Sequence, residues 1–124
     1  MLRECHRVLK PDGVLAGYII HTPPGLTPAQ EQEALDLGPS AVGAEASPAE
    51  MATAAGFREV GVRDVTDTFL ATLDRVISAR FSYEARLREL EGDQVFEDEQ
   101  GENEGRRRGV LSGLLKRSLI VARK

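Results

Sequence analysis

The sequence predicts an α/β fold, because three strand-like segments are separated by segments whose apolar residues recur with a helical period. Residues 14–20 form a continuous apolar run, which is typical of a strand that helices cover on both faces. Residues 57–65 alternate loosely and contain three valines, so we expect a second strand there. Residues 118–122 are mostly apolar and predict a strand near the end of the sequence.

Proline, glycine and capping residues mark the ends of the predicted helices. A first helix covers the opening residues and ends before Pro11, because proline disfavours helical geometry in the residue that precedes it. Residues 27–30 and 47–50 each place a hydroxyl residue, a proline, an alanine and a Gln or Glu in order, which predicts two helix starts with capping boxes. The longest helix is expected over residues 68–90. Residues 92–105, with three glycines and six acids, favour a solvated loop or a frayed helix start.

Length and composition limit the function classes. A chain of 124 residues is long enough for one domain, residues 1–124, and no apolar run approaches the roughly 18 residues that would suggest a membrane span. The net charge of −4, from 16 Lys and Arg against 20 Asp and Glu, argues against a nucleic-acid-binding protein. The single cysteine and the absence of a signal-peptide-like start predict a cytoplasmic protein. Cys5 and His6 are adjacent and point to different helix faces, so we expect no metal site.

Three segments, in this order, carry a resemblance to a known family. Residues 4–13 read E-C-H-R-V-L-K-P-D-G, residues 54–60 read A-A-G-F-R-E-V, and residues 114–124 read L-L-K-R-S-L-I-V-A-R-K. They resemble the stretches at the fifth, sixth and seventh strands of class I S-adenosylmethionine-dependent methyltransferases that act on small molecules, of the methyltransferase type 11 kind. Asp12 stands where the family usually has glycine, a mild change because aspartate also tolerates left-handed turns. The chain is thus similar to the C-terminal half of such a domain.

The resemblance implies a partial Rossmann-like methyltransferase fold. Its sheet would be three-stranded and mixed, in the order fifth, seventh, sixth, with the last strand antiparallel to its neighbours and helices beside it. In the family, S-adenosylmethionine is held by a glycine-rich loop after the first strand and by residues after the next three strands, all of which would precede Met1. Gly13 and Gly17 lie in an apolar run, and Gly101 and Gly105 lie in an acidic stretch, so neither pair suits a nucleotide loop. We therefore expect a truncated methyltransferase that, by itself, binds no S-adenosylmethionine and is inactive.

The substrate side of the family domain corresponds to residues 21–30 and to the insertion between the last two strands, about 66–116. His21 follows the first predicted strand at its carboxyl end and is the candidate proton acceptor in catalysis; the alternative is a strand-end histidine bonded to a backbone carbonyl. The candidate substrate-binding residues are Tyr18, Thr22, Phe69, Leu73 and Tyr83. Packing and turn roles also explain the first two, and a core-facing stripe also explains the three residues of the insertion.

The predicted sheet has consequences for partners. In the family the strand at residues 14–20 has a further neighbour, so its apolar edge and one sheet face are expected to be uncovered here. This predicts a homo-oligomer or a complementary N-terminal methyltransferase half, in addition to a small-molecule substrate. Two alternatives stay open: a non-enzymatic dimerisation or binding module that derives from the same fold, and an unrelated small α/β domain.

Overall fold

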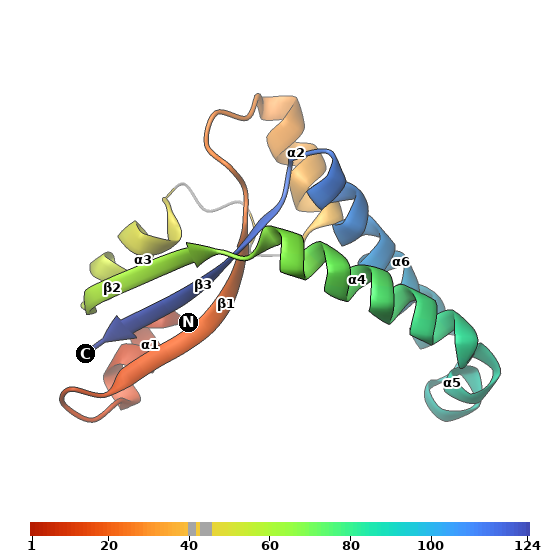
Figure 1. The fold of residues 1–124 in the computed structure, drawn as a ribbon, viewed down its shortest axis with the longest axis horizontal. Helices are drawn as coiled ribbons and strands as arrows, with labels where there is room; N and C mark the ends of the chain where they lie inside the picture. Colours follow the sequence, from red (N-terminus) through yellow and green to blue (C-terminus); the bar gives the residue numbers. More distant parts are fainter. Residues whose placement is uncertain (40–41, 43–45) are drawn as a thin grey trace.

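The computed structural model describes residues 1–39, 42 and 46–124, and it confirms the α/β fold. Figure 1 shows a sheet with short helices beside it and a long helical arm that extends away from one end of the sheet. The helices are α1 (Leu2–Val8), α2 (Pro28–Leu37), α3 (Pro48–Ala54), α4 (Thr66–Ser82), α5 (Glu84–Glu91) and α6 (Asp93–Leu111). The strands are β1 (Val14–His21), β2 (Arg58–Asp64) and β3 (Lys116–Arg123).

The sheet has the order β1-β3-β2, and β3 is antiparallel to both neighbours. This confirms the predicted order, in which the last strand of the chain lies between the other two. Both pairings among the described strands are antiparallel, so β1 and β2 run in the same direction on either side of β3. Val14 pairs with Arg123 and His21 with Lys116, so β1 matches β3 along its whole length. As a result, the carboxyl ends of β1 and β2 lie at the same end of the sheet, beside the start of β3.

Helices α1 and α3 cover one face of the sheet. Ile120 of β3 is buried with Ala52 of α3 in a core cluster. The partly buried residues packed around this cluster come mainly from α1, β1 and the end of α3: Leu2, Cys5, Leu9, Leu15, Ile19, Ala55 and Val60. On the opposite face Val14 is 52% exposed, Tyr18 is 59% exposed, and Val121 is also exposed. The helices thus cover one face of β1 along its length, whereas on the other face only its end is packed, where Ile20 meets a second core cluster with Ala34 of α2 and Leu115.

Both predicted capping boxes form. The Thr27 N–H donates to Gln30 Oε1 at 2.9 Å, and the Gln30 N–H donates back to the Thr27 hydroxyl at 3.3 Å. Ser47 and Glu50 repeat this arrangement at the start of α3, with distances of 2.8 and 3.3 Å. In each case proline occupies the first helical position, where no N–H is needed. These two helix starts therefore follow from local sequence alone.

The helical arm differs from the sequence prediction. The helical period of residues 68–90 is confirmed, but the helix breaks at Tyr83 into α4 and α5, and the longest described helix is α6, with 19 residues. The prediction of a loop or a frayed helix start over residues 92–105 is wrong, because this segment forms most of α6. Phe96 anchors it: the ring is 1% exposed, and the guanidinium groups of Arg80 and Arg88 lie 5.0 and 4.3 Å from its centre.

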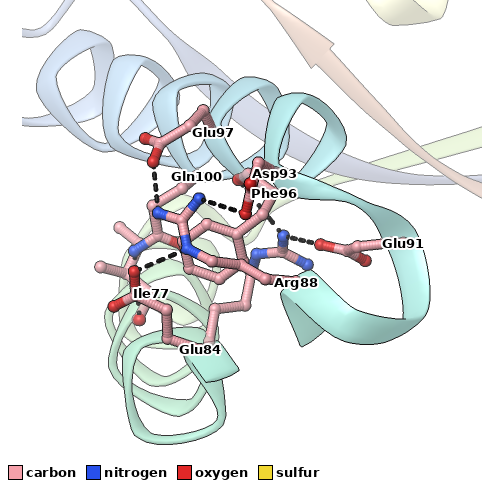
Figure 2. Close-up of polar contacts among 9 residues, drawn as sticks. Ile77, Glu84, Arg88, Glu91, Asp93, Phe96, Glu97 and Gln100 are labelled. Atoms are coloured by element: carbon pink, nitrogen blue, oxygen red, sulfur yellow. Dashed lines mark hydrogen bonds and ion pairs between the residues drawn. The ribbon is translucent and has the colours of Figure 1, made fainter. Parts of the chain in front are cut away.

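Ion pairs join the three helices at the tip of the arm, as Figure 2 shows. The partners of Arg88 are Glu84, Asp93 and Glu97. Hydrogen bonds to these carboxylates raise the pKa of Arg88, with the bond to Glu97 contributing most. Arg80 of α4 pairs with Glu91 at the end of α5. Single exposed pairs contribute little, but a network around a buried ring holds a chain segment whose composition is otherwise that of a loop.

Gly109 lets α6 approach the strand that follows it. A Cβ at this position would lie 2.5 Å from Cδ1 of Leu115, which is buried. The carbonyl of Gly109 also accepts hydrogen bonds from the N–H groups of Leu114 and Leu115, at 2.8 and 3.0 Å. These contacts fix the turn between α6 and β3, so the arm enters the sheet at a defined angle.

Candidate functional site

The candidate site lies at the end of the sheet where β1 and β2 finish and β3 begins. His21 is opposite Lys116, and Asp64 is opposite Ser118, so four polar residues form a row across the three strands on one face. Ligands of open α/β sheets gather outside the carboxyl ends of the strands. The row therefore lies where ligands bind in sheets of this kind, so it is the candidate site.

Both ring nitrogens of His21 are engaged. Nδ1 lies 3.0 Å from the carbonyl oxygen of Thr22, and Nε2 lies 2.9 Å from the hydroxyl oxygen of Ser118. A carbonyl oxygen only accepts, so Nδ1 carries the hydrogen, and in the neutral ring Nε2 accepts a hydrogen bond from Ser118. His21 thus makes the backbone contact of the non-catalytic alternative, and it also keeps one basic nitrogen, which a buried serine on β3 holds in place.

Asp64 is tied to the start of the helical arm. Its carboxylate accepts a hydrogen bond from the N–H of Thr66 at 2.9 Å and pairs with Lys116 at 3.3 Å. The hydrogen bonds from Thr66, together with Lys116, lower the pKa of Asp64 from 3.8 to about 2. Asp64 is therefore a charged, satisfied residue at neutral pH, and it serves to anchor α4 against the strand ends.

Arg117 lies on the other face of β3, and sequence analysis overlooked it. Its guanidinium carbon lies 4.1 Å from the centre of the Tyr18 ring and 4.8 Å from that of Phe69. Val65 donates a hydrogen bond to the Arg117 carbonyl at 2.8 Å, and Thr66 Oγ1 accepts one from the Arg117 N–H at 3.1 Å. Two of the predicted substrate residues therefore meet around a cation that lies within the third motif but was not among the candidate site residues. The available signal was a Lys-Arg pair at the start of an otherwise apolar strand.

An open groove of about 810 Å³ runs beside the edge of β1 that pairs with no described strand. Its walls include Leu2 of α1, Tyr18 and Ile19 of β1, and Met51 and Ala54 of α3. Most of these side chains are apolar, and Tyr18 and Ile19 come from opposite faces of β1. Tyr18 is shared, because it borders this groove and also stacks on Arg117. The groove therefore adjoins the group formed by Arg117, Tyr18 and Phe69, the Arg117 cluster.

The remaining predicted residues are spread out. Thr22 lies next to His21 and supplies the carbonyl oxygen that fixes its ring. Leu73 is buried within α4, where it belongs to the core of the arm. Tyr83 is 66% exposed at the junction of α4 and α5, at the far end of the arm from the sheet, as Figure 1 shows. The structure thus brings Tyr18 and Phe69 together and leaves Leu73 and Tyr83 elsewhere.

Comparisons with known proteins were made at the levels of sequence and structure. No family model and no curated protein matches the sequence. A protein of Galdieria sulphuraria assigned as a sarcosine dimethylglycine methyltransferase matches 99% of this chain at 20% identity, with a TM-score of 0.78 over 46% of its own length. Phosphoethanolamine N-methyltransferase 2 of Haemonchus contortus matches 99% at 14% identity, with a TM-score of 0.74 over 29% of its length. The cyclopropane synthase MmaA2 of Mycobacterium tuberculosis matches 99% at 17% identity, with a TM-score of 0.67 over 48% of its length.

The chain has a partial methyltransferase fold. At these identities the likeness concerns the fold alone. The chain spans less than half the length of each of the three structures, so each holds a large part of its methyltransferase fold outside the matched region. The Haemonchus enzyme was solved with S-adenosylhomocysteine and phosphomonomethylethanolamine.

The two glycine pairs considered for a nucleotide loop do not fit S-adenosylmethionine. Gly13 belongs to the turn before β1 and Gly17 lies inside that strand, whereas Gly101 and Gly105 lie inside α6. The Gly13 N–H donates to the Lys10 carbonyl at 2.9 Å, and amides within strands and helices are used by the ladder or the helix, so neither pair presents a loop of free N–H groups. The acid at the end of β2, Asp64, is already bonded to Thr66 and Lys116.

Two features are absent from the described part of the chain, which leaves out residues 40–41 and 43–45. No group of three or more His, Cys, Asp or Glu side chains is placed to hold a metal ion. No helix combines the length and the apolarity needed to cross a membrane.

Proposed function

We propose that this chain forms the substrate-side part of an S-adenosylmethionine-dependent methyltransferase that acts on a small molecule. The observation that carries the proposal is the match of 99% of the chain, at TM-scores of 0.67–0.78, to less than half of each methyltransferase-like neighbour. The polar row and the Arg117 cluster support it, because both lie at the carboxyl ends of β1 and β2, where a ligand can reach them.

Methyl transfer from a sulfonium is a displacement whose rate depends on holding donor and acceptor in line at short range. In the proposed division of labour, this chain holds the acceptor and removes its proton. His21 Nε2 is the proposed proton acceptor, because Thr22 keeps the hydrogen on Nδ1. To act, the ring exchanges its hydrogen bond with Ser118 for one with the substrate. S-adenosylmethionine, the proposed methyl donor, is held by polypeptide that carries the rest of the fold.

The unpaired edge of β1 is the proposed junction with that polypeptide. β3 is the only described strand that pairs with β1, and the groove beside the other edge is lined by apolar side chains from both faces. A strand added to this edge would gain backbone hydrogen bonds and bury Ile19 and Met51. A complementary methyltransferase half is the proposed occupant, and it fits the share of each neighbour that this chain does not span.

The test of function uses an extended protein, defined as these 124 residues joined to the polypeptide encoded directly upstream of Met1. We expect it to transfer a labelled methyl group from S-adenosylmethionine to a small amine or hydroxyl compound. His21→Gln should lower kcat about 100-fold or more without weakening donor binding, because general-base catalysis typically contributes that much. Ser118→Ala, which keeps the imidazole, is the matched control. An extended protein that neither binds the donor nor transfers its methyl group would overturn the proposal.

A second candidate function is a non-enzymatic module that associates through the same surface. The exposed apolar side chains of β1 favour it, since Val14 and Tyr18 are both more than half exposed. In this case the occupant of the β1 edge is a second copy of the chain. Size-exclusion chromatography with light scattering at micromolar concentration tests association. A monodisperse monomer of 13.5 kDa, with no dependence on concentration, would contradict it.

A further inference from the structure

Three buried side-chain nitrogen or oxygen atoms among the described residues have no hydrogen-bond partner: Arg80 Nε, Gln100 Oε1 and Arg117 Nε. The first two lie at the interface between α4 and α6, where Gln100 donates to the Ile77 carbonyl and Arg80 to that of Phe96. Arg80 Nε is a hydrogen-bond donor and Gln100 Oε1 is an acceptor, so a small shift of either side chain could pair them. Arg117 Nε has no such counterpart nearby. A buried donor without a partner is costly, and it often marks a missing ion or ligand.

Arg117 also differs from the other cations of β3. Lys116 pairs with Asp64, and Arg123 pairs with Glu59. No ion pair or side-chain hydrogen bond joins the Arg117 guanidinium to any residue in the described ranges. Its two Nη groups are not among the buried unpaired atoms, so they remain accessible from the surface. Arg117 is thus a guanidinium whose side-chain donors have no partner among the residues that the structure describes.

The surroundings hold this guanidinium in one orientation. The rings of Tyr18 and Phe69 lie against it at 4.1 and 4.8 Å, which suits a planar cation. Its backbone is fixed by Val65 and Thr66 at the start of α4. Because little side-chain freedom remains to be lost, binding at this position is pre-organised. An arginine stacked on aromatic rings presents its N–H groups at its edge, the geometry that carboxylate and phosphate oxygens match.

We propose that Arg117 binds a carboxylate or phosphate group of the methyl-acceptor substrate, so that the acceptor is an anionic small molecule. This inference rests on the proposed function for the role of the ligand, but not for the existence of the anion site. The Nη groups make the first contact, and a turn of the exposed Tyr18 ring brings Nε into a bidentate pair. Arg117 pairs with Ile20, one residue before the end of β1, so the rest of the acceptor reaches around this strand end toward His21 on the opposite face.

The test is a titration of the 15N-labelled chain with inorganic phosphate and with acetate, in a chloride buffer. The reporters are the Nε–H and backbone N–H signals of Arg117, assigned by their change in Arg117→Lys. We expect both to shift saturably, and Tyr18→Leu to weaken apparent binding about tenfold, or roughly 1.4 kcal/mol. Arg123→Lys is the matched control, because Arg123 lies on the same strand and face but already has a partner. Methylammonium chloride should shift neither reporter.

Signals of Arg117 that do not saturate, or that respond no more than those of Arg123, would overturn the proposal. Circular dichroism of each variant separates lost binding from lost folding, and Tyr18→Leu keeps the arginine if Arg117→Lys does not fold.

The extended protein distinguishes the two sources of an oxyanion. If phosphate no longer shifts Arg117 there, a protein carboxylate occupies it and the acceptor assignment is wrong. Otherwise Arg117→Lys should raise KM for the acceptor and leave donor binding unchanged. Absence of donor binding would overturn the proposed function alone.

Discussion

The sheet and the helical arm differ in how far their own residues cover their apolar surfaces and pair their charges. In the arm, α4, α5 and α6 enclose Phe96, and the charges around it pair with one another. In the sheet, α1 and α3 cover one face, while Val14 and Tyr18 on the other face are more than half exposed and no described strand pairs with the outer edge of β1. Residues 66–111 carry eleven acidic and seven basic side chains, so the whole net charge of −4 resides in the arm.

The helical arm is therefore complete by itself, whereas the sheet has a surface suited to binding a partner. A charged, internally paired surface is stable in water and gains little from a partner. An apolar edge strand with unused backbone groups is instead a template for pairing. The comparison therefore assigns the association surface to the sheet and treats the arm as a rigid support, which presents Thr66 and Phe69 to Arg117.

The largest effect is expected from Phe96→Ala. Removing a buried phenylalanine costs about 3–5 kcal/mol, and here it also leaves Arg80 and Arg88 without the ring on which they stack. Hydrogen exchange followed residue by residue should show loss of protection in α4, α5 and α6, with β3 protected as before. Equal loss of protection in β3 would show that the two regions are not separable.

The junction between the regions gives the next effect. Gly109→Ala places a Cβ 2.5 Å from Leu115 Cδ1, so we expect destabilisation of about 1–3 kcal/mol although alanine favours helices. Gly101→Ala, in the same helix, is the matched control, because its Cβ would meet nothing within 4 Å. It should stabilise the protein by up to ~1 kcal/mol. Urea unfolding of both variants measures the difference, and similar changes in both would contradict the packing account.

A lysine on the open edge should disturb association more than stability. Val14→Lys is expected to weaken assembly with a second copy or a complementary half about tenfold, equivalent to roughly 1.4 kcal/mol, because charged edge residues oppose strand pairing. Val95→Lys on α6, where the valine is also exposed, is the control for added charge. Light scattering over a dilution series compares them. If both variants associate equally, the β1 edge is not the contact surface.

The smallest effect concerns pH. Because the fold lowers the pKa of Asp64 from 3.8 to about 2, its stabilising effect is complete above the higher value and is lost as the pH falls toward the lower one. The carboxylate is about half exposed, so Asp64→Asn should cost less than ~1 kcal/mol at pH 7. Thermal unfolding of both proteins from pH 7 to pH 2 should show the gap closing between pH 4 and pH 2. A gap that is constant over this range would contradict the assignment.

Sequence reasoning succeeded where structure is decided locally. The strands β1 and β3 follow from apolar runs, and β2 follows from loose alternation with three valines. The starts of α2 and α3 follow from capping boxes that form as predicted. The order of the strands came from the family resemblance, which the structural neighbours confirm at the level of fold.

Sequence reasoning failed where distant residues decide. The acids and glycines of residues 92–105 resemble a loop, but in the structure the segment is a helix that buries Phe96 against Arg80 and Arg88. Arg117 could not be singled out either, because its significance depends on two aromatic rings about 100 and 48 positions away in the sequence. Composition indicates the secondary structure that a segment prefers in isolation. The helix at residues 92–105 and the environment of Arg117 both depend on contacts with residues distant in the sequence.

Calorimetric titration with S-adenosylmethionine tests the central claim most directly, when it is applied in parallel to the 124-residue chain and to the extended protein. The account predicts no measurable heat of binding for the chain and saturable binding for the extended protein, because the donor is proposed to bind to the part of the fold that this chain does not span. Tight binding by the chain alone would contradict the claim that the donor is held by polypeptide beyond the β1 edge.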